Sequence, residues 1–191
     1  MCTWFDETCG QLLDHVEARG LTNNTIVILV TDNGWIQLPD KRGFAPRSKR
    51  TAYEAGVRTP ILVSWPGTIE PAERSVPVST VDLAPTILAA CGAEVPDSLP
   101  GVNLLERNVD HGPVFGAAYT HDVVDIDHPE RSLVTRWVLS GDHKLLVHTD
   151  PDRKDELYNV VADPFEEKPL TDEETSKKLR AKLDGWWPAG G

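Results

Sequence analysis

An acid and an amide end the most apolar stretch of this 191-residue chain. The stretch "ILVTDNGW" leads directly into Asp32, Asn33 and Gly34. A carboxylate beside a carboxamide offers hard oxygen ligands, which suit Ca²⁺ or Mg²⁺ better than zinc. Open α/β sheets bind their ligands at the carboxyl ends of strands, where these residues are expected. Asn-Gly is also a common tight-turn pair, so the residues alone allow either a metal site or a turn.

Lys49 is the second candidate for chemistry, because it lies in a basic loop of an acidic chain. The net charge is −11, yet residues 40–50 hold five cations against the single acid Asp40. A lysine is a mobile point charge that can approach an anionic oxygen, so the loop suggests a local anion site, although a solvated basic loop is the simpler interpretation. The six histidines show no metal-pair spacing, and the sequence has neither a glycine-rich phosphate loop nor a G-x-S-x-G elbow.

Bulk properties exclude several classes of protein. The acidic balance argues against a nucleic-acid or anionic-membrane partner, and the longest apolar stretch is too short to cross a bilayer. The first residues, "MCTWFDETCG", lack the basic region of a signal peptide. Three cysteines give no disulfide framework. Cys2 and Cys9 are seven residues apart, so on a helix they would share one face, as small core residues.

The first half of the chain predicts a partial α/β sheet. An apolar stripe with helical spacing precedes Gly20, and the continuously apolar residues 25–31 predict a strand covered on both faces. Residues 34–52 have no periodicity, which in a compact domain indicates a functional or disordered loop. Residues 58–67 predict a second strand. Residues 79–92 predict a helix, with Ser79 or Thr80 as its cap and Gly92 at its end.

The second half predicts a different architecture. Short strand-like runs follow residue 101, with Gly141-Asp142 as a hairpin turn, and they indicate an antiparallel sheet. Residues 171–187 predict a final helix capped by Thr171, with Leu179, Leu183 and Trp186 on one stripe. The fold class is therefore α/β, with a small antiparallel β subdomain and a C-terminal helix. We expect one domain part over residues 1–105 and a second over residues 106–191.

Several motifs in order resemble the C-terminal half of a type I sulfatase of the alkaline phosphatase superfamily. "WFDETCGQLL" and "VTDNGW" are followed by "SKRTAYEAGVRTPILVSWPG", as in the family's D-N-G and K-x-x-x-Y-E-G-G-x-R-x-P patterns. "VSTVDLAPTILAACG" resembles the next family helix, and "RWVLSGDHKLLV" with "DELYNVVADPFEEKPL" resembles the family's tail. The resemblance implies a partial alkaline-phosphatase-like sheet with covering helices.

The resemblance also implies roles for the candidate residues. Asp32 and Asn33 would be two ligands of a Ca²⁺, with Mg²⁺ as an alternative, that holds the sulfate. Lys49, four residues before Tyr53, would contact the sulfate and stabilise the departing oxygen. A divalent cation and an ammonium suit this reaction, since a sulfate ester carries its charge on non-bridging oxygens. The expected substrate is a sulfated small molecule or glycan, and relatives of this family are expected in the periplasm or outside the cell.

The chain departs from the family pattern in three ways. Ala55 replaces the first glycine of Y-E-G-G, and Arg50 stands where many relatives have glycine; both are expected to affect loop geometry and not the ligands. The larger departure is the formylglycine nucleophile, which the family makes from C/S-x-P-x-R. No such motif occurs in the sequence. We therefore expect the nucleophile in an N-terminal half outside this chain, and expect the chain alone to be inactive.

Two alternatives stay open. A phosphonate or phosphate monoester hydrolase could use the same formylglycine, because sulfate and phosphate share a tetrahedral geometry. A zinc phosphohydrolase is disfavoured, because such enzymes usually have D-H-G where this chain has Asn33. A catalytically inactive, stand-alone remnant is the non-enzymatic alternative, although its unpaired strand edges would invite aggregation.

Overall fold

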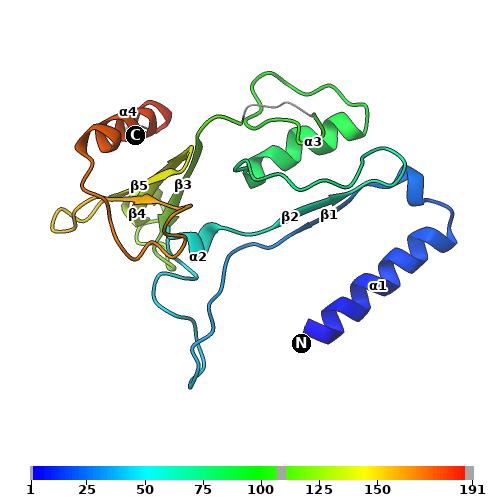
Figure 1. Cartoon of the computed structure of the whole chain (residues 1–191), viewed down its shortest axis with the longest axis horizontal. Coiled ribbons are helices and arrows are strands. Elements are labelled where there is room, and N and C mark those ends of the chain that lie inside the picture. Colours follow the sequence, from blue (N-terminus) through cyan, green and yellow to red (C-terminus); the bar gives the residue numbers. More distant parts are fainter. Residues whose placement is uncertain (1, 107–110, 188–191) are drawn as a thin grey trace. The chain divides into compact units, whose positions relative to one another are not determined.

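The computed structural model describes residues 2–106 and 111–187, and it divides into two compact units (Figure 1). The first unit comprises Met1–Val30 and Pro60–Val109, and the second comprises Thr31–Thr59 and Asp110–Gly191. The loop that carries all three candidate site residues therefore groups with the C-terminal sheet. The division of domains at residue 105 stays a prediction for the whole protein. No helix in the described ranges is both long and apolar enough to span a membrane.

The first unit is built on a two-stranded antiparallel ribbon. Strand β1 (Val27–Val30) pairs with β2 (Ile61–Ser64), with Val27 opposite Ser64 and Val30 opposite Ile61. The prediction of a strand covered on both faces is wrong within this unit, because no residue of β1 is buried. Among the described residues β1 has a single neighbouring strand, so its apolar side chains gain little cover.

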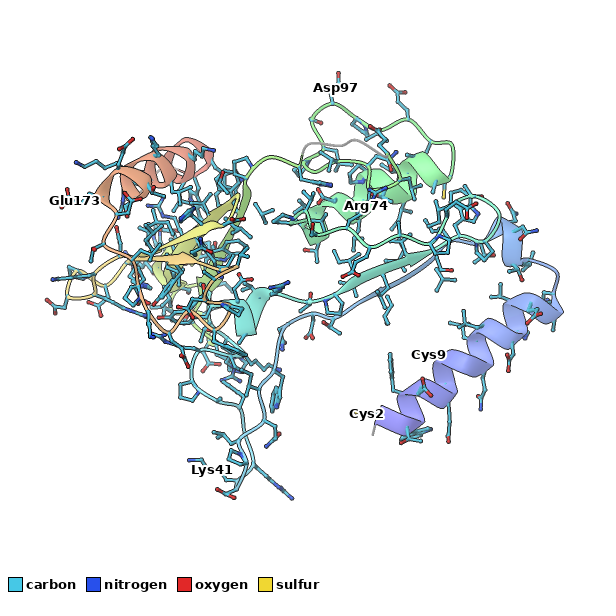
Figure 2. The ribbon with its side chains drawn as sticks, in the orientation of Figure 1. Cys2, Cys9, Lys41, Arg74, Asp97 and Glu173 are labelled. Atoms are coloured by element: carbon cyan, nitrogen blue, oxygen red, sulfur yellow. The ribbon has the colours of Figure 1, made fainter. Side chains whose placement is uncertain are left out.

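Helix α1 (Cys2–Ala18) leads through the short 3₁₀ turn η1 (Thr22–Asn24) into β1, as the apolar spacing predicted. None of its residues is buried, and no other element of the described chain packs extensively on it. Cys2 is exposed and Cys9 is partly exposed, so the prediction that they are core residues is wrong (Figure 2). Spacing placed the two cysteines correctly on a helix, but it could not supply a partner for the helix.

The predicted helix over residues 79–92 is confirmed as a 3₁₀ turn, η2 (Thr80–Asp82), continued by α3 (Leu83–Ala90). Ser79 is the cap: its hydroxyl accepts from the turn, and its own N–H donates to Asp82 Oδ2 at 2.7 Å. This reciprocal pair is a capping box, which satisfies two otherwise unpaired backbone donors. Gly92 ends the helix with φ +68°, a conformation that glycine adopts at low cost.

The second unit contains the predicted antiparallel sheet. Its strands lie in chain order and all pairs are antiparallel. The elements are β3 (Val114–Tyr119), the turn η3 (Pro129–Ser132), β4 (Leu133–Ser140), β5 (His143–His148), β6 (Glu156–Asn159) and helix α4 (Glu173–Trp186). Gly141 has φ +58° in the β4–β5 turn, which confirms the predicted hairpin.

Helix α4 covers one face of this sheet (Figure 1). Leu179 and Leu183 pack into a buried cluster with Val138, Leu145, Val147 and Leu157. The helix cap is Asp172, whose side chain accepts from two backbone N–H groups, so the prediction of Thr171 as the cap is wrong by one residue. Trp186 is half exposed, and its ring stacks on Phe115 with centroids 5.0 Å apart. The helix thus gives the strands an apolar backing.

The opposite face of the sheet carries the loop that follows Asn33. Ala52 and Tyr53 of the loop form a second buried cluster with Leu146, Tyr158 and Val160, and Trp137 packs at its edge. The short helix α2 (Glu54–Val57) continues directly from this contact. The sheet therefore has two unlike faces, one covered by a helix and the other by the predicted functional loop.

Candidate functional site

Asp32 and Asn33 form a bend immediately after β1. Asp32 is exposed and makes no hydrogen bond or ion pair with any residue that the structure describes. Asn33 is partly buried, and its amide Nδ2 donates to the carbonyl of Gly34 at 2.8 Å. That hydrogen bond involves only the nitrogen of the amide, and Oδ1, the atom that would bind a cation, takes no part in it. Neither Asn33 nor Gly34 has a positive φ, so the type I′ turn that Asn-Gly suggested is excluded.

Gly34 is needed for a close backbone approach. Its N–H donates to the carbonyl of Gly56 at 2.8 Å. A Cβ added at Gly34 would collide with the carbonyl oxygen of Ala55 and lie 2.9 Å from its carbonyl carbon. Real Cβ atoms essentially never approach backbone so closely, and here neither partner is a flexible side chain. The glycine of D-N-G therefore lets the metal-ligand candidates pack against the Y-E-A-G helix.

Gly56 makes a similar close backbone approach, to the residues on either side of Lys49. A Cβ at Gly56 would collide with the carbonyl oxygen of Ser48 and lie 2.6 Å from that of Thr51. Ser48 is fully buried, and its hydroxyl accepts from the backbone N–H of Ile36 at 2.9 Å. Two glycines thus connect the Asn33 segment, through α2, to the backbone on either side of Lys49.

Lys49 itself is only partly exposed. Its Nζ lies 5.3 Å from the ring centroid of Trp35, the residue after Gly34, in a cation–π contact. The side chains of Asp32, Asn33 and Lys49 make no hydrogen bond or ion pair with one another in the described chain. The structure therefore brings together the segments that carry them, and the lysine reaches back toward the segment that follows the acid and the amide.

Two arginines on either side of Lys49 have left-handed backbone conformations, Arg47 with φ 61° and Arg50 with φ 68°. A non-glycine residue in this region is uncommon and costs about 1 kcal/mol or more. Glycine would relieve Arg50, which agrees with the expectation that this departure affects loop geometry. Ala55 has no positive φ and sits in a helix, so it needs no glycine.

The sequence did not predict a cluster of hydrogen bonds around the carboxylate of Glu156, here called the hub, which holds Tyr53 at the end of the Lys49 loop. Glu156 of β6 accepts from the hydroxyls of Tyr53 at 2.7 Å and Tyr158 at 2.5 Å, and from Arg153 at 2.7 Å. Burial alone would raise the pKa of Glu156, but these hydrogen bonds outweigh it and lower the pKa to about 2. Burial and the bond to Glu156 raise the pKa of Tyr53. The hub fixes the tyrosine of Y-E-A-G to the sheet.

His148 of the neighbouring strand β5 completes the hub. Its Nε2 lies 3.1 Å from Glu156 Oε1, and its Nδ1 lies 2.9 Å from the hydroxyl of Thr135. Burial, followed by the charge of Arg153, lowers the pKa of His148, so the imidazole is neutral at pH 7. A neutral ring that donates from Nε2 and accepts at Nδ1 satisfies both contacts.

The donor set agrees in kind with a hard cation but supplies only part of a site. Asp32 and Asn33 offer adjacent oxygens, and Asp32 has no competing partner among the described residues. Ca²⁺ takes six or more oxygen ligands. The described residues contain no group of three or more His, Cys, Asp or Glu side chains placed to hold a metal. A bound cation would therefore need further ligands from elsewhere.

The mixed α/β fold of the described chain is similar to that of solved sulfatases with the alkaline-phosphatase-like fold. Residues 44–186 match the family described as N-sulphoglucosamine sulphohydrolase, C-terminal, and the chain belongs to this family. The matched range includes Lys49 and the Y-E-A-G helix, while Asp32 and Asn33 lie before it.

Two relatives illustrate the similarity. An N-acetylglucosamine-6-O-sulfatase of Bacteroides thetaiotaomicron is 32% identical over 168 residues, covering 84% of this chain and 29% of that protein. A protein solved in complex with its substrate D-glucosamine-2-N,6-O-disulfate is 27% identical with a TM-score of 0.72, covering 95% of this chain and 37% of that one. The chain thus spans about a third of the length of these relatives.

The fold also extends to the alternative class. The phosphonate monoester hydrolase of Agrobacterium radiobacter matches with a TM-score of 0.69 at 16% identity, covering 95% of this chain and 38% of that one. At this identity the likeness concerns the fold alone.

Proposed function

We propose that this chain is the C-terminal part of a sulfuric ester hydrolase. It contributes two calcium ligands, Asp32 and Asn33, and a sulfate-contacting lysine, Lys49. The formylglycine nucleophile is supplied from outside these residues, and the chain alone is inactive. Mg²⁺ is the alternative cation. A periplasmic or secreted location, as expected for the family, is part of this proposal.

One observation carries the proposal: the backbone contact of Gly34 with Gly56. It joins two motifs separated in sequence. The first motif would hold a cation and the second carries the Lys49 ammonium, and both positive charges would act on the same anion. Neither glycine is explained by a turn, since neither has a positive φ. Both positions are explained by close packing around the Lys49 loop. Family membership supports the same reaction class.

The chain's own residues would act on the sulfate by binding and charge stabilisation. Asp32 and Asn33 Oδ1 would hold the cation, which when bound offsets the negative charge on the non-bridging oxygens. The Lys49 side chain would turn away from the ring of Trp35. Its ammonium would then lie at the bridging oxygen, where negative charge develops as the S–O bond breaks. Each such preorganised contact is typically worth about 3 kcal/mol of transition-state stabilisation.

The proposed substrate class is a sulfated sugar. The similar proteins described above are named for, or solved with, glucosamine sulfates. A sulfate ester is favoured over a phosphonate ester because the family match is to sulfohydrolases, while the phosphonate hydrolase shares only the fold.

The DNA upstream of the Met1 codon tests the proposal first. An in-frame extension that encodes C-x-P-S-R supports it, while a stop codon with no such motif favours the inactive remnant. The extended protein is then assayed on matched sulfate, phosphate and phosphonate esters of one phenol. Sulfate ester hydrolysis at least about tenfold above the other two is expected, a margin of 1.4 kcal/mol in barrier height. Preference for the phosphonate would overturn the assignment.

Three variants of the extended protein then test the residues. Asp32→Ala, Asn33→Ala and Lys49→Met are each expected to lower kcat/KM at least about a hundredfold, as for loss of a transition-state contact. Lys41→Met is the matched control, because Lys41 is an exposed lysine of the same loop, at its outer end (Figure 2). Equal activity of Lys49→Met and Lys41→Met would remove Lys49 from the mechanism.

A further inference from the structure

A buried lysine that the proposed reaction does not use lies under the candidate loop. Lys144 is on β5, one of the two inner strands of the sheet, and its side chain is 0% exposed. Its Nζ lies 2.8 Å from Glu54 Oε1 and 3.2 Å from Glu166 Oε1. The side chains of the two glutamates are 8% and 1% exposed. Charged groups are almost never buried this completely unless they are paired.

The triad joins three separate parts of the chain. Lys144 comes from the sheet, Glu54 from the first turn of α2, and Glu166 from the segment after β6. Glu166 also accepts from the backbone N–H of Glu54 at 2.5 Å, and its carbonyl accepts from Arg47. Glu166 itself has φ 54°, so the segment is held in an uncommon conformation to reach these partners. Arg47 and Glu54, on either side of Lys49, therefore both contact Glu166, and Glu54 also pairs with the buried ammonium.

The connection to Lys49 runs through short contacts. Glu54 begins α2, and Gly56 of that helix packs on the carbonyls of Ser48 and Thr51. Thr51 Oγ1 donates to the carbonyl of Ser48 at 2.7 Å, and Ser48 Oγ accepts from the N–H of Lys49 at 2.6 Å. A displacement of α2 must therefore move the backbone at Lys49.

Burial alone does not require this arrangement. A buried ion pair is often no more stabilising than apolar residues of similar volume, so stability does not explain two carboxylates around one ammonium. In some proteins buried charged groups instead fix a single geometry of the parts that they join. On the opposite face of the same sheet, helix α4 is held by an apolar cluster and by the buried Arg136, which pairs with Asp184 of the helix. The fully buried lysine between two carboxylates lies on the face where the loop carries Lys49.

We infer that Lys144 is a positioning residue, which with Glu54 and Glu166 holds the Lys49 loop in register with the Asp32–Asn33 segment. The inference rests on the proposed function for the chemical role of Lys49. The geometry of the loop can be tested without it.

The test is hydrogen exchange with mass spectrometry on the full 191-residue chain and its Lys144→Met variant. The amides of residues 48–57 are expected to exchange at least about tenfold faster in the variant, while those of β3 and α4 keep their rates. The indole N–H signal of Trp35 is expected to shift in NMR spectra, because Lys49 leaves its ring. Lys178→Met is the matched control, since Lys178 pairs with Glu174 at 2.5 Å on the exposed side of α4.

A uniform increase in exchange over the sheet, with an unmoved Trp35 signal, would mean that the triad only stabilises the unit, and it would overturn the inference. Unchanged exchange in residues 48–57 would overturn it too. If Lys144→Met fails to fold, Glu54→Gln is examined in the same way, because it keeps the volume and an acceptor oxygen. A loop-specific effect in Glu54→Gln supports positioning, and a uniform effect overturns it.

Activity separates this inference from the proposed function. In the extended protein, Lys144→Met is expected to lower kcat with little change in KM, because Lys49 is present but displaced. If Lys49→Met has no effect while the exchange result holds, the role of Lys49 is wrong and the positioning of the loop stands. If Lys49→Met abolishes activity and Lys144→Met leaves kcat unchanged, the positioning role is wrong.

Discussion

The hub at Glu156 predicts a specific loss of stability in acid. Its carboxylate has a pKa of about 2 in the folded chain against an ordinary value of 4.5. A group with a lowered folded pKa stabilises the fold above its unfolded pKa, and the contribution is lost as pH falls through the folded value. The shift of 2.5 units corresponds to about 3.4 kcal/mol. Because the side chain keeps some exposure, we discount this to about 2 kcal/mol for solvent screening.

Glu156→Gln isolates this contribution, since glutamine keeps the shape but has no charge to titrate. At about pH 7 the variant is expected to unfold with a free energy about 2 kcal/mol lower than the unmodified chain. With pKa values of 4.5 and about 2, less than half of this difference remains at about pH 3. Urea unfolding followed by near-ultraviolet circular dichroism measures both values, since Tyr53 and Tyr158 are partners of the carboxylate.

Glu174→Gln is the control for the same substitution at an exposed ion pair on α4. It is expected to cost less than about 0.5 kcal/mol at either pH. A cost of Glu156→Gln that stays the same from neutral to acid pH would refute the reasoning, because the contribution would then owe nothing to ionisation. A cost no larger than that of the control would show that the hydrogen bonds of the hub add no net stability.

Three further predictions follow from the site. Gly34→Ala should lower the free energy of unfolding by more than about 2 kcal/mol in urea titrations, because its Cβ meets backbone atoms of α2, whereas Gly10→Ala, with open space around it, should be neutral or stabilising. Arg50→Gly should leave the free energy of unfolding unchanged or raise it by up to about 1 kcal/mol in the same titrations, because Arg50 has φ 68°. A decrease in the free energy of unfolding would mean that the Arg50 side chain stabilises the fold more than its backbone strain destabilises it. Calcium should bind the isolated chain weakly or not at all by calorimetry, because Asp32 and Asn33 are too few ligands, and tight binding would contradict the partial site.

Secondary structure in the C-terminal half followed well from the sequence. Two strand-like runs on either side of Gly141-Asp142 predicted the hairpin, because the turn is decided by local residue chemistry. The cap of α4 was misplaced by one residue, as Thr171 and Asp172 are both good caps and only backbone geometry chooses between them. The covering of β1 and the burial of Cys2 and Cys9 were predicted wrongly. Apolar periodicity shows which face of a helix or strand is suited to burial. It does not show whether another element of the chain covers that face.

The candidate site was predictable as motifs but not as an arrangement. Asp32, Asn33 and Lys49 were candidates by residue type and position, the family pattern implied their roles, and those roles stay predictions. The pair Asn33-Gly34 allowed either a turn or a metal site, whereas the requirement for Gly34 comes from Ala55, more than twenty residues later in the sequence. Lys144, its two glutamates and Glu156 all lie in stretches that resemble family motifs. Their pairing was not predicted, because isolated charges in strands look like solvent-facing positions until the sheet is assembled.

The outer part of the loop has a consequence for how such proteins diversify. Gln37 and Phe44 form an isolated bridge, and Gln37 also bonds the carbonyls of Leu38 and Lys41, so residues between them close on themselves. Lengthening a closed segment costs only about 0.6 kcal/mol per doubling. If the proposed function holds, insertions at this tip would change what a ligand meets at the rim of the site and leave the anchored Lys49 segment undisturbed. The residues that select a ligand and the residues that react with it could then change independently.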